Sequence, residues 1–363
     1  MAKIAFLHHS FIAGSGIDGV IYELAKRLGK KHDVRVLTFR TDGAYSDVPV
    51  TVFKSRGART DAVCGLLYAG EVRKELEKFD VVATQLYPAS AMPHFPCRIS
   101  TRHVMTAWGV QNIGRGVDKA YSDFLRAMEG VCARRADIVL AGCDAVRKSL
   151  EKVRPDAVTL YQYGIDFQTM NYDGYDPRRL EEKYGIKAED RVLLFVGRNS
   201  PHKRIDLLVD MVDKIPDKSV RLAVVGRQDF TENKARLEEQ VAGLGIKDRV
   251  LFTGVVSRRE VVDWYCRCDL FVNASEWEGF LIPEAYAFRK AIVAYDAEPH
   301  RETVQPSRGI LVRKLDAGMF ADAVVTLLLD RKYRKTMGEN GYTWVRTVLD
   351  YDRIVENWER IAL

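Results

Sequence analysis

Cysteine, long apolar runs and clustered basic residues are all scarce in this chain of 363 residues. The six cysteines are scattered except for Cys266 and Cys268, and a lone Cys-x-Cys pair is a weak metal site. We therefore expect reduced thiols and no bound metal. No apolar run approaches the roughly 18 residues that span a bilayer. The chain has no Lys/Arg-rich run of the kind that indicates nucleic-acid binding. Its net charge of +6 suits phosphorylated substrates or an anionic membrane surface.

Signals for secretion and for several catalytic classes are also missing. The opening "MAKIAFLHHS" has too few apolar residues for a signal peptide, so it predicts a first strand and a cytoplasmic protein, with peripheral contact to the membrane face left open. The chain contains neither G-x-x-x-x-G-K-[ST] nor G-x-S-x-G, the patterns of P-loop kinases and serine hydrolases. Asp350 to Asp352 spell a metal-binding D-x-D string, but they precede a helical pattern, where aspartate caps helices.

What the chain does contain is an alternation of apolar β-branched runs and amphipathic helical patterns. Runs that are apolar almost throughout predict strands covered on both faces, hence parallel sheets. The alternation predicts an α/β fold with two Rossmann-like, doubly wound domains that face a cleft. The predicted strands are Lys3–His8, Val34–Phe39, Asp80–Thr84, Ile138–Ala141, Val158–Tyr161, Val192–Gly197, Arg221–Gly226, Val250–Phe252, Leu270–Asn273 and Ala291–Ala294.

The strand-helix pattern is interrupted once. Residues 166–190 are rich in Tyr, Asp and Gly and contain Pro177, so they are predicted to be a linker. This gives a first domain over 1–165 and a second over 191–346. The end of the chain, 347–363, forms an amphipathic pattern and is expected to pack back on the first domain.

The stretch "FVGRNSPHK" places two cations just after a predicted strand. Gly197 and Arg198 follow the strand, and Lys203 is expected to open the next helix. Free backbone N–H groups and the helix dipole add to these charges, and Arg can hold two oxygens, which favours a diphosphate ligand. The alternative is that both are solvated surface cations.

The stretch "LFVNASEWEGFLIPEAYAF" brings three carboxylates, Glu276, Glu278 and Glu284, within nine residues. Pro283 and Glu284 are expected to open a helix, and Gly279 allows a ligand to approach the backbone closely. Carboxylates at such a loop suit the hydroxyls of a ribose or a sugar. An equally good interpretation is that Glu284 only complements the helix dipole, while Glu276 and Glu278 are solvated.

Together these stretches resemble the family 4 retaining glycosyltransferases of the GT-B fold (group 1), over nearly the whole chain. The family pattern of Gly-Arg, four residues and Lys is present as Gly197, Arg198 and Lys203. In chain order, the segments "RRADIVLAGCDAVRKSL", "YGID", "RLEEQVAGLGIKDRVLFTGVV" and "SEWEGFLIPEAYA" also match.

The resemblance implies an enzyme that uses a UDP- or GDP-sugar donor and requires no further cofactor. By analogy, Arg198 and Lys203 neutralise the diphosphate as it leaves, next to Gly197. Glu284 binds the ribose hydroxyls, and Val255 lines the base pocket with its backbone. The acceptor would be a hydroxyl of a glycan, a lipid-linked compound or a small molecule. The resemblance leaves the acceptor and the oligomeric state open.

The sugar-binding glutamate departs from the family spacing. The family has seven residues between its two glutamates, and in this chain seven residues separate Glu276 from Glu284. Aligning on "EGF" gives Glu278 instead, followed by Gly279 and Phe280 as the family requires, so Glu278 is preferred. Backbone N–H groups from Gly279 to Leu281 would assist it.

Two further features are assigned to the first domain. His103, in "STRHVMTAWG", is expected to follow a strand and to face the donor sugar, although a structural loop histidine is nearly as good an interpretation. "GSGIDG" spells the G-x-G-x-x-G of dinucleotide-binding proteins, but the gap from His9 is too long. Gly16 and Asp18 fit the family's first loop better, and the resemblance implies that this loop faces the donor diphosphate across the cleft.

The resemblance also implies a mechanism without a carboxylate nucleophile. The acceptor hydroxyl would attack from the face that the diphosphate leaves. Alternatives are an epimerase or phosphorylase of the same fold, an NAD(P)-dependent oxidoreductase, and a non-catalytic two-lobed binding protein.

Overall fold

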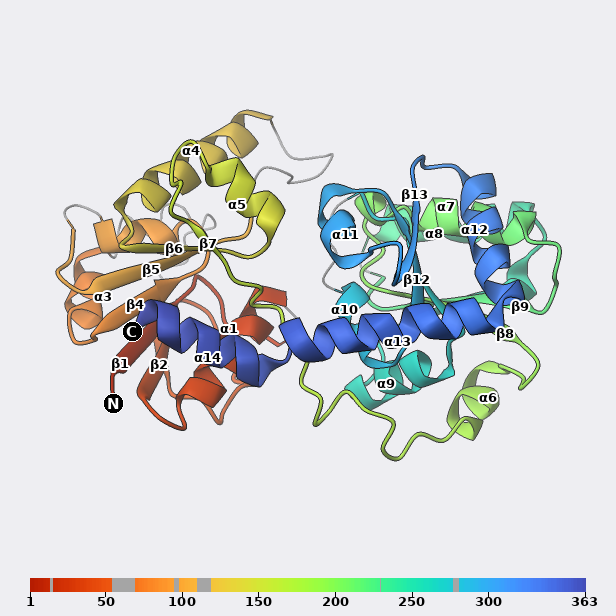
Figure 1. Ribbon diagram of the computed structural model, residues 1–363, viewed down its shortest axis with the longest axis horizontal. Coiled ribbons are helices and arrows are strands. Elements are labelled where there is room, and N and C mark those ends of the chain that lie inside the picture. Colours follow the sequence, from red (N-terminus) through yellow and green to blue (C-terminus); the bar gives the residue numbers. More distant parts are fainter. Residues whose placement is uncertain (14–15, 54–68, 95–97, 110–118, 229, 277–280) are drawn as a thin grey trace. The chain divides into compact units, whose positions relative to one another are not determined.

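The computed structural model describes residues 1–13, 16–53, 69–94, 98–109, 119–228, 230–276 and 281–363 (Figure 1). The chain divides into two compact units. The first unit comprises Met1–Gly164 and Tyr351–Leu363, and the second comprises Ile165–Asp350. Each unit is built on one parallel sheet, which confirms the predicted α/β fold of two Rossmann-like domains.

The first unit contains a seven-stranded parallel sheet in the order β3-β2-β1-β4-β5-β6-β7. Two of its strands, β3 and β5, are absent from the predicted set. β3 has three partly exposed residues and so lacks a buried apolar run, while β5 begins with Arg102 and His103, which hide its apolar character. The strands are β1 Lys3–Leu7, β2 Asp33–Thr38, β3 Val50–Val52, β4 Val81–Thr84, β5 Arg102–Ala107, β6 Ile138–Ala141 and β7 Val158–Thr159.

The last helix of the chain, α14, belongs to the core of the first unit. Ile354, Val355 and Trp358 are buried there, and the Trp358 ring lies 5.6 Å from that of Phe6 on β1. The helices of this unit are α1 Gly16–Leu28, α3 Ala69–Leu76, α4 Lys119–Arg135, α5 Asp144–Leu150 and α14 Tyr351–Ala362, with a 3₁₀ helix at Ala89–His94.

The D-x-D string sits where this last helix begins. Asp352 lies on the first turn of α14, and its carboxylate is 3.2 Å from Nε of Arg27 on α1. Asp350 pairs with Arg346 at 3.0 Å. Both carboxylates therefore have structural partners.

The second unit contains a six-stranded parallel sheet in the order β10-β9-β8-β11-β12-β13. The strand order reverses between β8 and β11, which is the topological switch point where open α/β sheets bind ligands. The strands are β8 Arg191–Val196, β9 Val220–Val225, β10 Val250–Gly254, β11 Leu270–Asn273, β12 Ala291–Tyr295 and β13 Gly309–Val312. Only β13 was not predicted.

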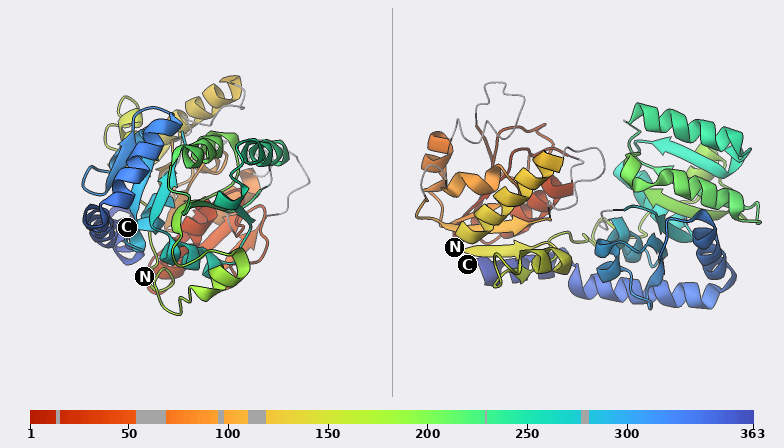
Figure 2. Two further views of the ribbon diagram at one scale, coloured as in Figure 1. Left: turned by 90° about the vertical axis from the view of Figure 1, so that its right-hand side faces the viewer. Right: turned by 90° about the horizontal axis from the view of Figure 1, so that it is seen from above.

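Helices cover both faces of this second sheet (Figure 2). The helices are α6 Arg178–Tyr184, α7 Ile205–Lys214, α8 Thr231–Gly243, α9 Arg258–Arg267, α10 Leu281–Ala287, α11 Glu298–Thr303, α12 Ala317–Leu329 and α13 Arg331–Val348, with 3₁₀ turns at Pro201–Lys203 and Lys247–Arg249. None of the helices in the described ranges combines the length and apolar character needed to cross a membrane.

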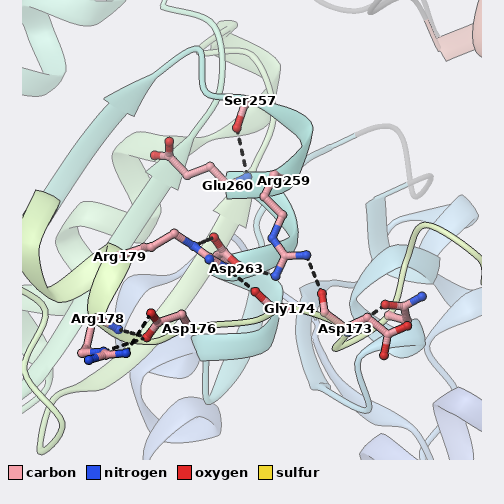
Figure 3. Close-up of polar contacts among 10 residues, drawn as sticks. Asp173, Gly174, Asp176, Arg178, Arg179, Ser257, Arg259, Glu260 and Asp263 are labelled. Atoms are coloured by element: carbon pink, nitrogen blue, oxygen red, sulfur yellow. Dashed lines mark hydrogen bonds and ion pairs between the residues drawn. The ribbon is translucent and has the colours of Figure 1, made fainter.

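Residues 166–190, expected as a linker, make their contacts within the second unit. Asp263 on α9 is 1% exposed, and its two oxygens accept from Nε and Nη2 of Arg179 at 2.8 and 2.7 Å (Figure 3). Arg259, one turn before Asp263 on α9, pairs with the same carboxylate at 3.3 Å and donates to the carbonyl of Asp173. This buried carboxylate joins the segment to α9.

Candidate functional site

The residues singled out in the second half of the chain follow neighbouring strands of the second sheet. Arg198 follows β8, and Glu276 and Glu284 follow β11, the strand that pairs with β8. Val255 follows β10 directly. Because all these strands are parallel, their carboxyl ends lie along one side of the sheet, where β8 and β11 flank the switch point. The fold therefore collects cations and carboxylates that are distant in the sequence.

The loops after β8 and β9 approach each other too closely for side chains. A Cβ on Gly226 would lie 2.3 Å from the carbonyl oxygen of Gly197, and Gly226 has φ +137°. Asn199 then joins the two loops, since its amide donates to the Phe230 carbonyl at 3.0 Å and accepts from the Phe230 N–H at 3.0 Å. These two hydrogen bonds tie the loop that carries Arg198 to the loop after β9.

Arg198 lies over an aromatic ring. Its guanidinium carbon is 5.1 Å from the centroid of the Phe230 ring, a cation–π distance. Neither Phe230 nor Asn199 was predicted from the sequence. Their role depends on the pairing of two loops about 30 residues apart, which no local pattern reveals.

Lys203 does not open α7 as expected. It ends the 3₁₀ turn Pro201–Lys203, and α7 begins at Ile205, after Arg204 in a left-handed conformation with φ +50°. The side chain still lies just before the N-terminus of α7. Lys203 is 5% exposed, and lysine is almost never so buried unless its charge is satisfied.

Glu284 lies on the first turn of α10, and two described side chains donate to its carboxylate. It accepts from the Tyr265 hydroxyl at 2.9 Å and from Nη1 of Arg258 at 3.1 Å. The helix begins at Leu281, two residues before the predicted start, so Pro283 stands inside its first turn, where a missing N–H has no cost. Glu284 is 6% exposed, so its carboxylate is buried beside these donors on the first turn of the helix.

Of the other two glutamates, Glu276 and Glu278, the structure describes the contacts of Glu276. The backbone N–H of Glu276 donates to the His202 carbonyl at 3.0 Å, and its carboxylate is 3.5 Å from Nη1 of Arg204. Glu276 thus links its loop to the loop after β8. Glu278, Gly279 and Phe280 lie outside the described residues.

Leu281 and Val255 follow two strands of the same sheet, β11 and β10. Leu281 is the first residue of α10 and is partly buried. Val255 follows Gly254, which has φ +71°, and its side chain is 72% exposed.

His103 is not where the sequence predicted it. It lies inside β5, at the amino end of that strand, and is 1% exposed. Its Nε2 is 2.8 Å from Oγ1 of Thr84, and its Nδ1 is 3.0 Å from Nε2 of His94. Ligands bind at the carboxyl ends of parallel strands, so a buried histidine at the amino end is a core residue rather than a catalytic one.

This histidine pair predicts that the first unit loses stability in acid. Burial lowers the pKa of His94 to about 4 and also lowers that of His103. Below the ordinary histidine pKa near 6.5, both histidines are protonated in the unfolded chain but stay neutral in the folded chain. The free energy of unfolding therefore falls as the pH is lowered from about 6.5 to 4, by up to about 1.4 kcal/mol per pH unit for each histidine. Denaturant titrations at several pH values measure the slope. His94→Gln should flatten it, and an unchanged slope would contradict the assignment.

The first loop of the first unit is organised by Asp18. This fully buried carboxylate accepts from the Ile12 N–H at 2.9 Å and from the Ser10 hydroxyl at 3.2 Å, and it lies 3.4 Å from Nε2 of His8. Gly16 is the first residue of α1, and no described atom lies within 4 Å of its would-be Cβ. Gly14 and Ser15 lie outside the described residues.

Comparison with known proteins matches both halves of the chain. A family model described as "Glycosyl transferases group 1" matches residues 176–344, and one described as "Glycosyltransferase Family 4" matches residues 14–169. The chain resembles in fold the Anabaena protein HepE in complex with UDP and glucose, with TM-score 0.84, 21% identity and 99% of each chain covered.

Curated relatives are glycosyltransferases as well. The D-inositol 3-phosphate glycosyltransferase of Xylanimonas cellulosilytica is 30% identical over 53% of this chain and 50% of that protein, so the chain spans about half its length. The N-acetyl-alpha-D-glucosaminyl L-malate synthase of Bacillus anthracis is 26% identical over 99% of this chain and 96% of that protein. The resemblance drawn from the sequence motifs is confirmed, and the chain belongs to the family 4, group 1 glycosyltransferases of the GT-B superfamily.

Proposed function

We propose that this protein transfers a sugar from a UDP- or GDP-sugar to an acceptor hydroxyl, with retention of the anomeric configuration. The observation that carries the proposal is that Arg198 and Lys203 follow β8 while the buried Glu284 follows β11, the strand paired with β8. Cations for a diphosphate and a buried carboxylate for hydroxyls are what a nucleotide-sugar requires.

The diphosphate is assigned to the β8 side. Arg198 can hold two phosphate oxygens with its planar fork, and Lys203 adds a point charge beside the N-terminus of α7. Negative charge grows on the diphosphate as the bond to the sugar breaks. Fixed cations at that place stabilise the transition state more than the bound donor, which accelerates transfer.

The nucleoside and the sugar are assigned to the β10 and β11 side. Glu284 binds the ribose hydroxyls, and the backbone at Val255 contacts the base. Because Glu276 is already paired with Arg204, Glu278 is the glutamate we assign to the donor sugar. The Anabaena neighbour, which was solved with UDP and glucose, supports a donor of this class.

The transfer itself needs no protein nucleophile. The acceptor oxygen forms a bond to the anomeric carbon on the face from which the diphosphate departs. The acceptor proton passes to a phosphate oxygen of the leaving group, so charge and atoms balance. The protein aligns the reactants and stabilises the leaving group.

The acceptor is a hydroxyl of a glycan, a lipid-linked compound or a small molecule. The relatives' names support small hydroxyl compounds, since they give an inositol phosphate and L-malate. The net charge of +6 favours encounter with anionic donors and allows contact with an anionic membrane surface from the cytoplasmic side.

Ligand-induced stabilisation and donor turnover test the proposal. UDP or GDP should raise the unfolding temperature, since a ligand at one hundred times its dissociation constant stabilises the folded state by about 2.7 kcal/mol. NAD⁺ is the control and should cause no shift. With the matching nucleotide-sugar, nucleoside diphosphate should be released only when an acceptor is present. Stabilisation by NAD⁺ alone, or release that is independent of acceptor, would contradict a transferase.

A further inference from the structure

The two donors to Glu284 both come from one face of α9. Arg258 and Tyr265 are seven residues apart, about two helical turns, so they lie on the same side of the helix. The start of α9 is fixed by Ser257, whose hydroxyl accepts from the Glu260 N–H at 3.2 Å (Figure 3). The helix thus presents both donors toward α10 in a set register.

The Tyr265 hydroxyl has little freedom to move. Tyr265 is fully buried, and its ring stacks on Phe288 at 5.4 Å and on Phe271 at 6.0 Å between centroids. The hydroxyl therefore points to Oε2 of Glu284 at 2.9 Å in a direction that the core determines. The contact is a fixed feature of the unit rather than an adaptable surface bond.

Arg258 orients the other oxygen of the same carboxylate. Its Nη1 donates to Oε1 at 3.1 Å, and its Nη2 lies 2.8 Å from the sulfur of Met170. Each carboxylate oxygen can accept about two hydrogen bonds. Among the described residues each oxygen has one donor, which sets the plane of the carboxylate and leaves one further acceptor site on each oxygen toward a ligand.

We infer that Tyr265 and Arg258 are positioning residues that set the Glu284 carboxylate to accept from the two hydroxyls of the donor ribose. The inference rests on the proposed function and adds to it the residues that make the nucleotide site selective for ribose. Two adjacent hydroxyls match two acceptor sites held in one plane. A carboxylate free to rotate would lose that match.

The test compares UDP with 2′,3′-dideoxy-UDP by titration calorimetry on the full chain, with the GDP pair used in the same way. The wild type should bind the ribose form about tenfold or more tightly, as expected for hydrogen bonds to a charged group. Glu284→Gln should abolish most of this preference. Tyr265→Phe, which keeps the stacked ring, and Arg258→Gln should each reduce the preference by about threefold or more.

Arg259→Gln is the matched control, because it removes the same charge from the next residue of α9 without touching Glu284. Its ribose preference should equal that of the wild type. General loosening of the unit would weaken both ligands equally and leave their ratio unchanged. If Glu284→Gln loses the preference while Tyr265→Phe and Arg258→Gln keep it, the inference alone is overturned. If Glu284→Gln keeps it, the ribose assignment in the proposed function is overturned as well.

Discussion

Replacing Arg198 or Lys203 with a neutral side chain is expected to lower the rate of sugar transfer by about 10²–10³-fold, the usual cost of removing one preorganised electrostatic stabiliser. Both cations lie after β8 and before α7, where the proposed function places the departing diphosphate. Arg198→Ala suits the first position. Lys203→Met suits the second, because Lys203 is 5% exposed and methionine fills its volume without its charge. Initial rates at saturating donor measure the effect.

Lys214→Ala provides the matched control for these two variants. Lys214 is an exposed cation at the opposite end of the same helix, α7, away from the carboxyl edge of the sheet. Its loss changes the net charge equally and should leave the rate unaltered. Circular dichroism should show all three variants folded. Full activity in both Arg198→Ala and Lys203→Met would reject the diphosphate assignment.

Gly338→Ala is expected to destabilise the second unit by about 3 kcal/mol, the upper end of the usual cost of overpacking. A Cβ on Gly338 of α13 would lie 2.0 Å from the carbonyl oxygen of Arg289 and 2.6 Å from its carbonyl carbon. Both are backbone atoms, so they cannot move aside as a flexible side chain could. Arg289 is itself tied to α13, with its guanidinium 3.7 Å from the Tyr342 ring centroid and 3.0 Å from Glu339.

Close packing and helix propensity have opposite effects on this substitution. In an isolated helix, Gly→Ala stabilises by about 1 kcal/mol, so propensity alone predicts a gain. Gly130→Ala is the control, because Gly130 lies inside α4 and its nearest neighbour to a new Cβ is 4.0 Å away. That variant should be neutral or more stable. Denaturant unfolding compares the two, and equal or greater stability of Gly338→Ala would show that α13 does not pack this closely.

Much of the fold could be predicted because its signals are local. An apolar run such as β8 or β11 indicates a buried strand by composition, and the alternation with helices indicates parallel sheets. β3 escaped prediction because it is short and partly exposed, and β5 because Arg102 and His103 open it. The same boundary error placed His103 after a strand, although its true position inside β5 makes it part of the core.

The sequence by itself determined the family, the two-domain α/β class and the order of the motifs, since each of these depends on residues close together in the chain. It also placed Arg198 after a strand and Glu284 near a helix start. Only the tertiary structure decided what these residues contact. Arg198 lies over Phe230, Glu276 is paired with Arg204, and Glu284 is held by Arg258 and Tyr265. Such contacts join separate elements, and their geometry depends on how the sheet brings strand ends together rather than on any local spacing.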